Sequence, residues 1–362
     1  MIYDWLAHKL MKYENLISLR YNVVAVVING EDKGVYILEE FFDKKLIEDN
    51  QHRDGLILKP LHPLKIYTEK KLLLDPFTKY SVHLIKQLFM SFRQGTLHPK
   101  QLFDYDKMSR FLAIIKLTGG EHALMIHNIR FYFNPITARL EPIGREFSIK
   151  ANIDINIFHH KLYKRFMDDP EFVKLYVQEL YRLSKPKYLD IFFSEYELDL
   201  QKAERILHRQ QPYQSLSKNY FYKQQRIIIS ELTLSHENIK TTYVWGKNRL
   251  DLLVENLSNY PLKISSFSSS SKKLNNLFNQ ALDSNSTITR GRTNFSLKIP
   301  SINIQEISES LMNAEIAFKI YGLERQTISL IIPSSKGQTL INSLSLMRKS
   351  PNPEDFSFIK IV

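Results

Sequence analysis

An unbroken apolar run near the N-terminus limits the possible folds of this chain more than any other stretch. Residues 23–28 read Val-Val-Ala-Val-Val-Ile, and this β-branched run without a polar position predicts a strand that is buried on both faces. Asn29 and Gly30 end the run, and Gly34 follows after a short polar loop. Glycine supplies the positive φ that a chain reversal needs, so residues 35–38 are predicted to return as the second strand of a β-hairpin.

A third strand is predicted at residues 55–60, after one or two helical turns over residues 42–50. The second strand is followed by Glu40, and the third ends at Lys59 before a proline. Side chains at the ends of neighbouring strands can form a half-buried ion pair. Two interpretations stay open for this pair: ordinary exposed strand-end charges, or a pair that holds a nucleotide phosphate, as the lysine and glutamate of protein kinases do.

Length and composition indicate a folded protein with room for two domains. The chain has 362 residues, of which 43% are hydrophobic and 12% aromatic, and it contains no cysteine. The lack of cysteine excludes disulfides, thiolate nucleophiles and cysteine-bound metals. No run of about 18 apolar residues occurs, so no transmembrane segment is expected. Residues 1–5 lack the basic-then-apolar order of a secretory signal, and the compartment stays open between cytoplasm and a cell or spore surface.

The formal net charge of +12 is compatible with an anionic partner. The lysines are spread over both halves of the chain, and no run of five or six like charges occurs. The charge therefore permits phosphate chemistry, whereas no nucleic-acid partner is expected, because no nucleic-acid-binding motif accompanies it.

Amphipathic spacing predicts several helices in the first 210 residues. Helices are expected at residues 5–18 with Asp4 as cap, 79–95 ending at Gly95, 99–117 opening at Pro99, 169–183 and 187–209. Helices that follow a small sheet indicate an α+β fold with a small β lobe and a larger helical lobe.

A second hairpin is predicted after Gly119-Gly120, with strands at residues 129–133 and 140–143. Hairpin geometry places its two ends side by side, so Asn128 and Glu146 are predicted neighbours although 18 positions separate them. An amide and a carboxylate oxygen suit Mg²⁺ bound to ATP phosphates.

The alternative for this loop is local hydrogen bonding by His122, His127 and Asn128, with Glu146 as a surface charge. A zinc site is disfavoured, because the two histidines lie five positions apart without an evident third ligand.

Two strings in this chain resemble the spore coat kinase (CotH) family. The first is Asn29-Gly30, Gly34, Tyr36, Leu38 and Glu40, which is similar to the family's N-G-x-x-x-G-x-Y-x-L-x-E segment in the smaller lobe of an atypical kinase. The second is N-x-R-F-Y-F-N-P-I-T-x-x-L-E-P-I, residues 128–143, which is similar to the hairpin after the family's metal-coordinating asparagine. The resemblance covers about residues 5–210.

The resemblance implies a kinase that transfers the γ-phosphoryl group of ATP, with Mg²⁺ or Mn²⁺, to Ser or Thr of a protein at a bacterial spore coat or cell surface. In this assignment Lys59 contacts the phosphates and Glu40 orients Lys59. Asn128 and Glu146 hold the metal, with Glu146 where the family has Asp.

The chain departs from the family in two respects. The family's upstream Asp would fall near Ala123, where this sequence has none, so His122 or Glu121 would have to activate the acceptor. Several family strands usually precede the helix at residues 5–18, so the resemblance implies truncation at the N-terminus. A strand that starts after residue 352 and then halts indicates truncation at the C-terminus as well. These departures support an alternative function, a pseudokinase that acts as an assembly protein.

After Tyr213 the sequence becomes rich in short strands. They are predicted from residue 226 onward, at 242–245, 261–264, 317–320 and 329–332, with one helix at 273–282 and an exposed serine loop at 265–273. This pattern predicts an all-β sandwich-like domain over residues 211–345, after a CotH-kinase-like domain over 1–210 and before the start of a further strand or tail over 346–362.

Overall fold

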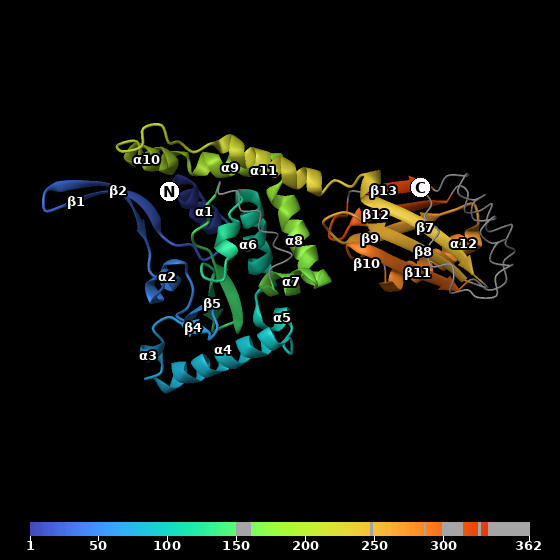
Figure 1. The fold of residues 1–362 in the computed structure, drawn as a ribbon, viewed down its shortest axis with the longest axis horizontal. Coiled ribbons are helices and arrows are strands. Elements are labelled where there is room, and N and C mark those ends of the chain that lie inside the picture. Colours follow the sequence, from blue (N-terminus) through green and yellow to red (C-terminus); the bar gives the residue numbers. More distant parts are fainter. Residues whose placement is uncertain (150–160, 247–248, 286, 299–313, 325–326, 332–362) are drawn as a thin grey trace. The chain divides into compact units, whose positions relative to one another are not determined.

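The computed structural model describes residues 1–149, 161–246, 249–285, 287–298, 314–324 and 327–331. The chain forms two compact units, Met1–Ile229 and Ser230–Val362 (Figure 1). This division falls later than residue 210 because residues predicted as strand from Arg226 belong to helix α11 (Lys218–Glu231). Phe221 of α11 packs against Tyr3 and Phe193, which holds the helix on the first unit.

The first unit mixes helices with two small sheets. Its strands are β1 (Tyr21–Ile28), β2 (Glu31–Glu39), β3 (Leu56–Lys59), β4 (Lys65–Ile66), β5 (Arg130–Asn134) and β6 (Arg139–Ile143). Its other helices are α1 (Ile2–Tyr13), α2 (Lys44–Asp49), α3 (Glu69–Leu72), α4 (Pro76–Gln94), α5 (Pro99–Leu102), α6 (Tyr105–Thr118), η1 (Glu121–Leu124), α7 (Lys161–Met167), α8 (Pro170–Leu183), α9 (Pro186–Glu195) and α10 (Glu197–Leu207).

The first predicted hairpin forms, but its predicted burial is wrong. Strands β1 and β2 pair antiparallel in a two-stranded sheet, and Gly30 and Gly34 have the positive φ expected of the loop. In β1 only Val23 is buried, whereas Val27 and Ile28 are 62% and 52% exposed. The apolar run stays accessible because, among the described residues, no third strand joins this ribbon (Figure 1).

The third predicted strand, β3, belongs to a different sheet from β2. The second sheet has the antiparallel order β4-β3-β5-β6, so β3 lies beside the second predicted hairpin. The strand ends that carry Glu40 and Lys59 are therefore not neighbours in one sheet, as the sequence had suggested. Proximity along the chain misled the prediction, because β3 pairs with a strand more than seventy residues downstream.

Several helix boundaries differ from prediction for local reasons. Asp4 lies inside α1 and accepts a hydrogen bond from the Ser148 backbone N–H instead of capping the helix. The helix predicted at 99–117 is divided into α5 and α6, because Asp104 caps a new helix there. The helix predicted at 187–209 is likewise two helices, α9 and α10. Helices α4 and α8 form where they were predicted, and Gly95 ends α4.

The second sheet packs on an apolar cluster that joins the early and late parts of the first unit. Its buried members come from the α1–β1 and β2–α2 connections, α2, β3, β5 and β6: Ile17, Leu19, Phe42, Leu46, Ile47, Ile57, Tyr132 and Ile143. Tyr67 packs against this cluster from the segment after β4. The cluster thus fixes β3 and the β5–β6 hairpin, which carry most of the predicted site residues.

The described residues of the second unit form two antiparallel sheets, with orders β11-β8-β7 and β10-β9-β12-β13. Its elements are η3 (His236–Asn238), β7 (Ile239–Gly246), β8 (Arg249–Asn256), β9 (Leu262–Ser268), α12 (Lys272–Asn285), β10 (Thr287–Ile288), β11 (Gly291–Lys298), β12 (Glu315–Ile320) and β13 (Thr327–Ile331). The helix predicted at 273–282 is confirmed as α12, whereas much of the predicted serine loop belongs to β9. The predicted tail at 346–362 lies outside the described residues. The sandwich itself stays a prediction.

Candidate functional site

Lys59 is the predicted phosphate-binding residue, and it lies half-buried at the end of β3. Its ammonium group forms no ion pair or hydrogen bond within the described ranges. Partial burial lowers the pKa of Lys59, and the charges of Arg130, Lys65 and Arg145 lower it further, whereas the Glu146 carboxylate acts in the opposite direction. Lys59 therefore lies in a positively charged environment and within electrostatic reach of Glu146.

Arg130 is a buried cation at the start of β5, with 2% of its surface exposed. Its Nε donates to the Tyr67 hydroxyl at 2.6 Å, and one terminal nitrogen donates to the backbone carbonyls of His127 and Asn128, both at 2.8 Å. No carboxylate pairs with it in the described part of the chain. Its guanidinium also lies over the Phe42 ring, 5.2 Å from the ring centroid. Neutral partners thus hold Arg130 while its charge stays uncompensated.

Arg145 follows β6 and lies between two carboxylates. It contacts Glu39 through Nε at 3.2 Å and Glu146 through a terminal nitrogen at 2.7 Å. Its guanidinium lies 5.7 Å from the centroid of the same Phe42 ring. The four side chains Lys59, Lys65, Arg130 and Arg145 are called the cationic cluster below. Two carboxylates, Glu39 and Glu146, accompany these four cations, so the cluster has the electrostatic character of an anion site.

The structure brings together Asn128 and Glu146, the two predicted metal ligands, through His122. Nδ1 of His122 lies 2.8 Å from the Glu146 backbone oxygen, and the Asn128 amide donates to the His122 backbone oxygen at 3.0 Å. Asn128 is buried, while the Glu146 side chain is 43% exposed. The β5–β6 pairing positions both ends of this bridge, since Arg130 and Ile143 are the last paired residues of the hairpin.

The His122 ring is held through its Nδ1 atom. This nitrogen lies 2.8 Å from the Glu146 backbone oxygen, 3.0 Å from the Asn128 amide nitrogen and 3.3 Å from the Ser148 hydroxyl oxygen. The carbonyl requires a proton on Nδ1, whereas the amide nitrogen requires a lone pair there, so each tautomer of the ring keeps one of these two contacts. Nε2 forms no hydrogen bond within the described residues, so this nitrogen is available beside Asn128 and Glu146.

Glu40 has a different partner from the one predicted. Its carboxylate accepts from the Arg20 side chain at 2.5 and 2.9 Å and from the Arg20 backbone N–H at 3.1 Å. The Glu40 side chain is only 6% exposed, and its carboxylate is paired with Arg20. The predicted Glu40–Lys59 ion pair is absent, because β2 and β3 belong to different sheets.

Glu121, which was predicted to be catalytic together with His122, lies in η1. Burial is the main cause that raises the pKa of Tyr220 in α11, and the charge of Glu121 raises it further.

The described residues contain no group of three or more His, Asp or Glu side chains arranged to bind a metal ion. Asn128 and Glu146 offer two oxygen ligands. Mg²⁺ is commonly held by one or two protein oxygens together with substrate phosphates, so this pair fits a metal that arrives with a nucleotide. It does not fit an all-protein metal site.

Two charged groups were not predicted from the sequence. These are the cationic cluster as a unit and the His52–Glu141 pair. Arginine in a strand of otherwise buried residues is an unusual charge, and this signal could have singled out Arg130. Behind the hairpin, His52 Nε2 lies 2.9 Å from the buried Glu141 carboxylate, and Nδ1 lies 2.7 Å from the Asn50 carbonyl. Because both partners accept, His52 is held as the charged imidazolium. The hydrogen bond to Glu141 is the main cause that raises the pKa of His52.

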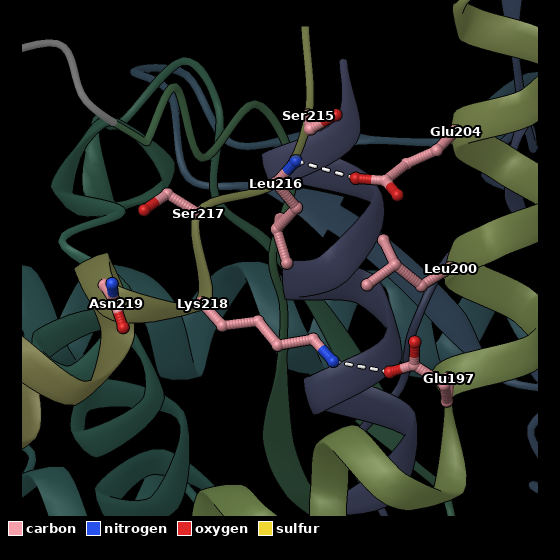
Figure 2. A pocket seen from close by; sticks show the side chains of 8 residues that line it. All are labelled: Glu197, Leu200, Glu204, Ser215, Leu216, Ser217, Lys218 and Asn219. Atoms are coloured by element: carbon pink, nitrogen blue, oxygen red, sulfur yellow. Dashed lines mark hydrogen bonds and ion pairs between the residues drawn. The ribbon is translucent and has the colours of Figure 1, made fainter.

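A pocket lies elsewhere in the first unit, between α10 and residues 215–219, which lead into α11 (Figure 2). The charged side chains that line the pocket pair with other groups of the same chain. Lys218 pairs with Glu197 at 2.5 Å, and Glu204 accepts from the Leu216 backbone N–H at 2.8 Å, as the dashed lines in Figure 2 show. These contacts attach the start of α11 to α10, which favours a structural role for this hollow.

Nowhere in the described chain is a helix both long and apolar enough to cross a bilayer, in agreement with the sequence expectation. No family model matches this chain, and no curated protein matches it. The resemblance to the CotH family therefore stays a prediction from the two strings quoted above.

Proposed function

We propose that the first unit binds the phosphates of ATP at the cationic cluster and, as a CotH-like atypical kinase, transfers the γ-phosphoryl group to Ser or Thr of a surface or coat protein. The main support is the state of Lys59, whose ammonium group has no anionic partner among the described residues and lies near Arg130, Lys65 and Arg145. Like charges that crowd together cost free energy, and a bound polyphosphate would offset that cost.

The chemistry of such a transfer would divide among three side chains. The acceptor hydroxyl oxygen forms a bond to the γ-phosphorus, the bond from phosphorus to the β,γ-bridging oxygen breaks, and ADP leaves. The hydroxyl proton would pass to the imidazole of His122, whose Nδ1 is held by Glu146 and Asn128. Asn128 and Glu146 would hold Mg²⁺ or Mn²⁺, which neutralises charge on the transferred group.

The proposal is tested with the whole protein, labelled ATP, Mg²⁺ and a mixture of Ser/Thr-containing acceptors. Lys59→Ala should lower labelling by about 100-fold or more, since positioning and charge neutralisation supply most of the rate of phosphoryl transfer. Lys202→Ala is the matched control, because Lys202 is an exposed lysine on α10 outside the cluster. Equal labelling by the Lys59→Ala variant and the wild type would reject the assigned role of Lys59.

A second function, a pseudokinase assembly protein, is favoured by one specific observation. Arg20 holds Glu40, so the lysine–glutamate pair that orients the phosphate-binding lysine in protein kinases is not formed. Thermal melting with and without Mg-ATP separates the outcomes. A ligand at 100 times its dissociation constant adds about 2.7 kcal/mol of stability, so a shift without labelling would indicate binding alone. If neither a thermal shift with Mg-ATP nor labelling is observed, the ATP site is rejected.

A further inference from the structure

The corner of the first unit formed by α3 and the start of α4 carries an unusual group of exposed apolar side chains. Leu74, Phe77 and Tyr80 are 84%, 87% and 70% exposed, and Leu73 between the helices is 37% exposed. Four neighbouring apolar residues at this level of exposure differ from the scattered single residues common on protein surfaces. These four side chains are not part of the core, because α4 buries a separate stripe of residues that begins at Val82.

The α3–α4 corner is held together by contacts between its two helices. Asp75 caps α4 by accepting from the Thr78 backbone N–H at 2.9 Å, and the Thr78 hydroxyl donates to the Leu72 carbonyl at 2.5 Å. Lys86 of α4 pairs with Glu69 of α3. These contacts tie α3 to α4, and Figure 1 shows α3 beside the N-terminal end of α4.

The charges around this apolar tip are positive and unpaired. Lys70, Lys71 and Lys79 are exposed, and none of their ammonium groups forms an ion pair or hydrogen bond in the described chain. The two neighbouring acids are engaged, Glu69 with Lys86 and Asp75 with the helix cap. An approaching partner therefore meets exposed apolar and aromatic side chains close to three ammonium groups that have no partner within the described residues.

We propose that the α3–α4 corner, Lys70, Lys71, Leu73, Leu74, Phe77, Lys79 and Tyr80, docks on an anionic lipid surface. Leucine and phenylalanine would enter the boundary between headgroups and acyl chains, and the lysines would contact the anionic headgroups. The exposed lysines beside exposed leucine and phenylalanine side chains favour an anionic membrane over a protein groove. This proposal does not depend on the phosphate site, because it uses none of the same side chains.

Sedimentation of the whole protein with lipid vesicles tests the proposal. Wild type should sediment with vesicles of phosphatidylcholine mixed with phosphatidylserine and stay in solution with phosphatidylcholine alone. Each lysine near an anionic surface contributes about fivefold to binding, so Lys70→Glu, Lys71→Glu and Lys79→Glu together should weaken it by about 100-fold or more. Leu74→Ser with Phe77→Ser should also abolish sedimentation.

The matched control is Leu198→Ser with Ile136→Ser, two exposed apolar residues outside the corner, 70% and 74% exposed. It should sediment like wild type, and circular dichroism checks that each variant is folded. Failure of wild type to bind the anionic vesicles, or unchanged binding by the Leu74/Phe77 variant, would overturn the proposal.

Insertion has its own readout that does not depend on loss of binding. The emission of a tryptophan introduced by Phe77→Trp should shift to shorter wavelength with anionic vesicles, whereas that of one introduced by Leu198→Trp should not. Equal emission with and without vesicles at position 77 would also reject the proposal.

Discussion

The two hairpins of the first unit have opposite relations between sequence and burial. The β1–β2 hairpin contains the most apolar run of the chain, yet Val27, Ile28 and Tyr36 are more than half exposed. The β5–β6 hairpin contains Arg130 and Glu141, and both of these charged residues are buried. Hydrophobicity determines how much a strand would gain from burial, whereas neighbouring elements determine whether it is buried.

Their neighbours explain the difference. Among the described residues, strand β1 pairs with β2 alone. The ribbon contacts α10, and Gln210, three residues after the end of α10, accepts from the Val35 backbone N–H at 2.9 Å. Strand β5 lies between β3 and β6 and faces the apolar cluster through Tyr132. In the β5–β6 hairpin, Arg130 is held by carbonyls and a hydroxyl and Glu141 by His52, so the burial of both charges is tolerated.

Replacing one tyrosine in each hairpin by alanine should give the largest difference in stability loss between the two hairpins. Tyr132 is fully buried in β5 and donates to the Arg53 carbonyl, whereas Tyr36 in β2 is 51% exposed. Tyr132→Ala should destabilise the first unit by about 3–5 kcal/mol, because it leaves a cavity and removes a hydrogen bond. Tyr36→Ala should change the free energy of unfolding by less than about 1 kcal/mol.

Urea unfolding followed by tryptophan fluorescence measures both tyrosine variants. The chain has two tryptophans, so a Trp245→Phe background leaves the buried Trp5 as a reporter of the first unit. Similar losses from Tyr132→Ala and Tyr36→Ala would contradict the contrast between the hairpins.

Alanine substitutions at Gly55 and Gly30 test the same contrast between the hairpins, with smaller expected losses of stability. A Cβ at Gly55 would lie 2.6 Å from the Phe133 backbone oxygen and 2.7 Å from the Tyr132 ring, so Gly55→Ala should cost about 2–3 kcal/mol. Gly30, at the end of β1, has nothing within 4 Å of such an atom but has φ +83°. Gly30→Ala should cost only the backbone strain, about 1 kcal/mol, in the same unfolding assay. A larger loss at Gly30 would indicate that the ribbon is packed.

The smallest expected effect is the pH dependence of the His52–Glu141 pair. The pKa of His52 is raised above its ordinary 6.5, so its stabilisation is complete below pH 6.5 and is lost as pH rises through the folded pKa. Burial raises the pKa of Glu141, but hydrogen bonds from His52 and Asn134 give a net lowering below 4.5. The stabilisation from Glu141 is therefore complete above pH 4.5 and is lost on acidification.

Urea midpoints between pH 6 and pH 9 measure the His52 part. Wild type should lose about 1 kcal/mol relative to a His52→Gln variant, which lacks the titrating group. The nearby Lys107 lowers the pKa of His52 and makes this a smaller effect than an isolated pair would give. An exposed control, His62→Gln, should retain the wild-type pH profile, and an unchanged profile in His52→Gln would reject the assignment.

Local patterns predicted most elements and part of the candidate site. The two hairpins, α4, α8 and α12 form where turn residues, caps and periodicity indicated, and the ends of the second hairpin bring Asn128 close to Glu146. The hairpin prediction succeeded because strand pairing across a short turn depends on adjacent residues alone.

The sequence by itself determined most of the elements, the excess of positive charge and the neighbouring positions of Asn128 and Glu146. Tertiary structure decided three things: the pairing of β3 with β5, the choice of Arg20 as the partner of Glu40, and the gathering of Lys59 with Arg130 and Arg145. Each of these depends on which distant segments come into contact. Such contacts are selected by the packing of the whole unit, because one strand or one charge has many partners of comparable local energy.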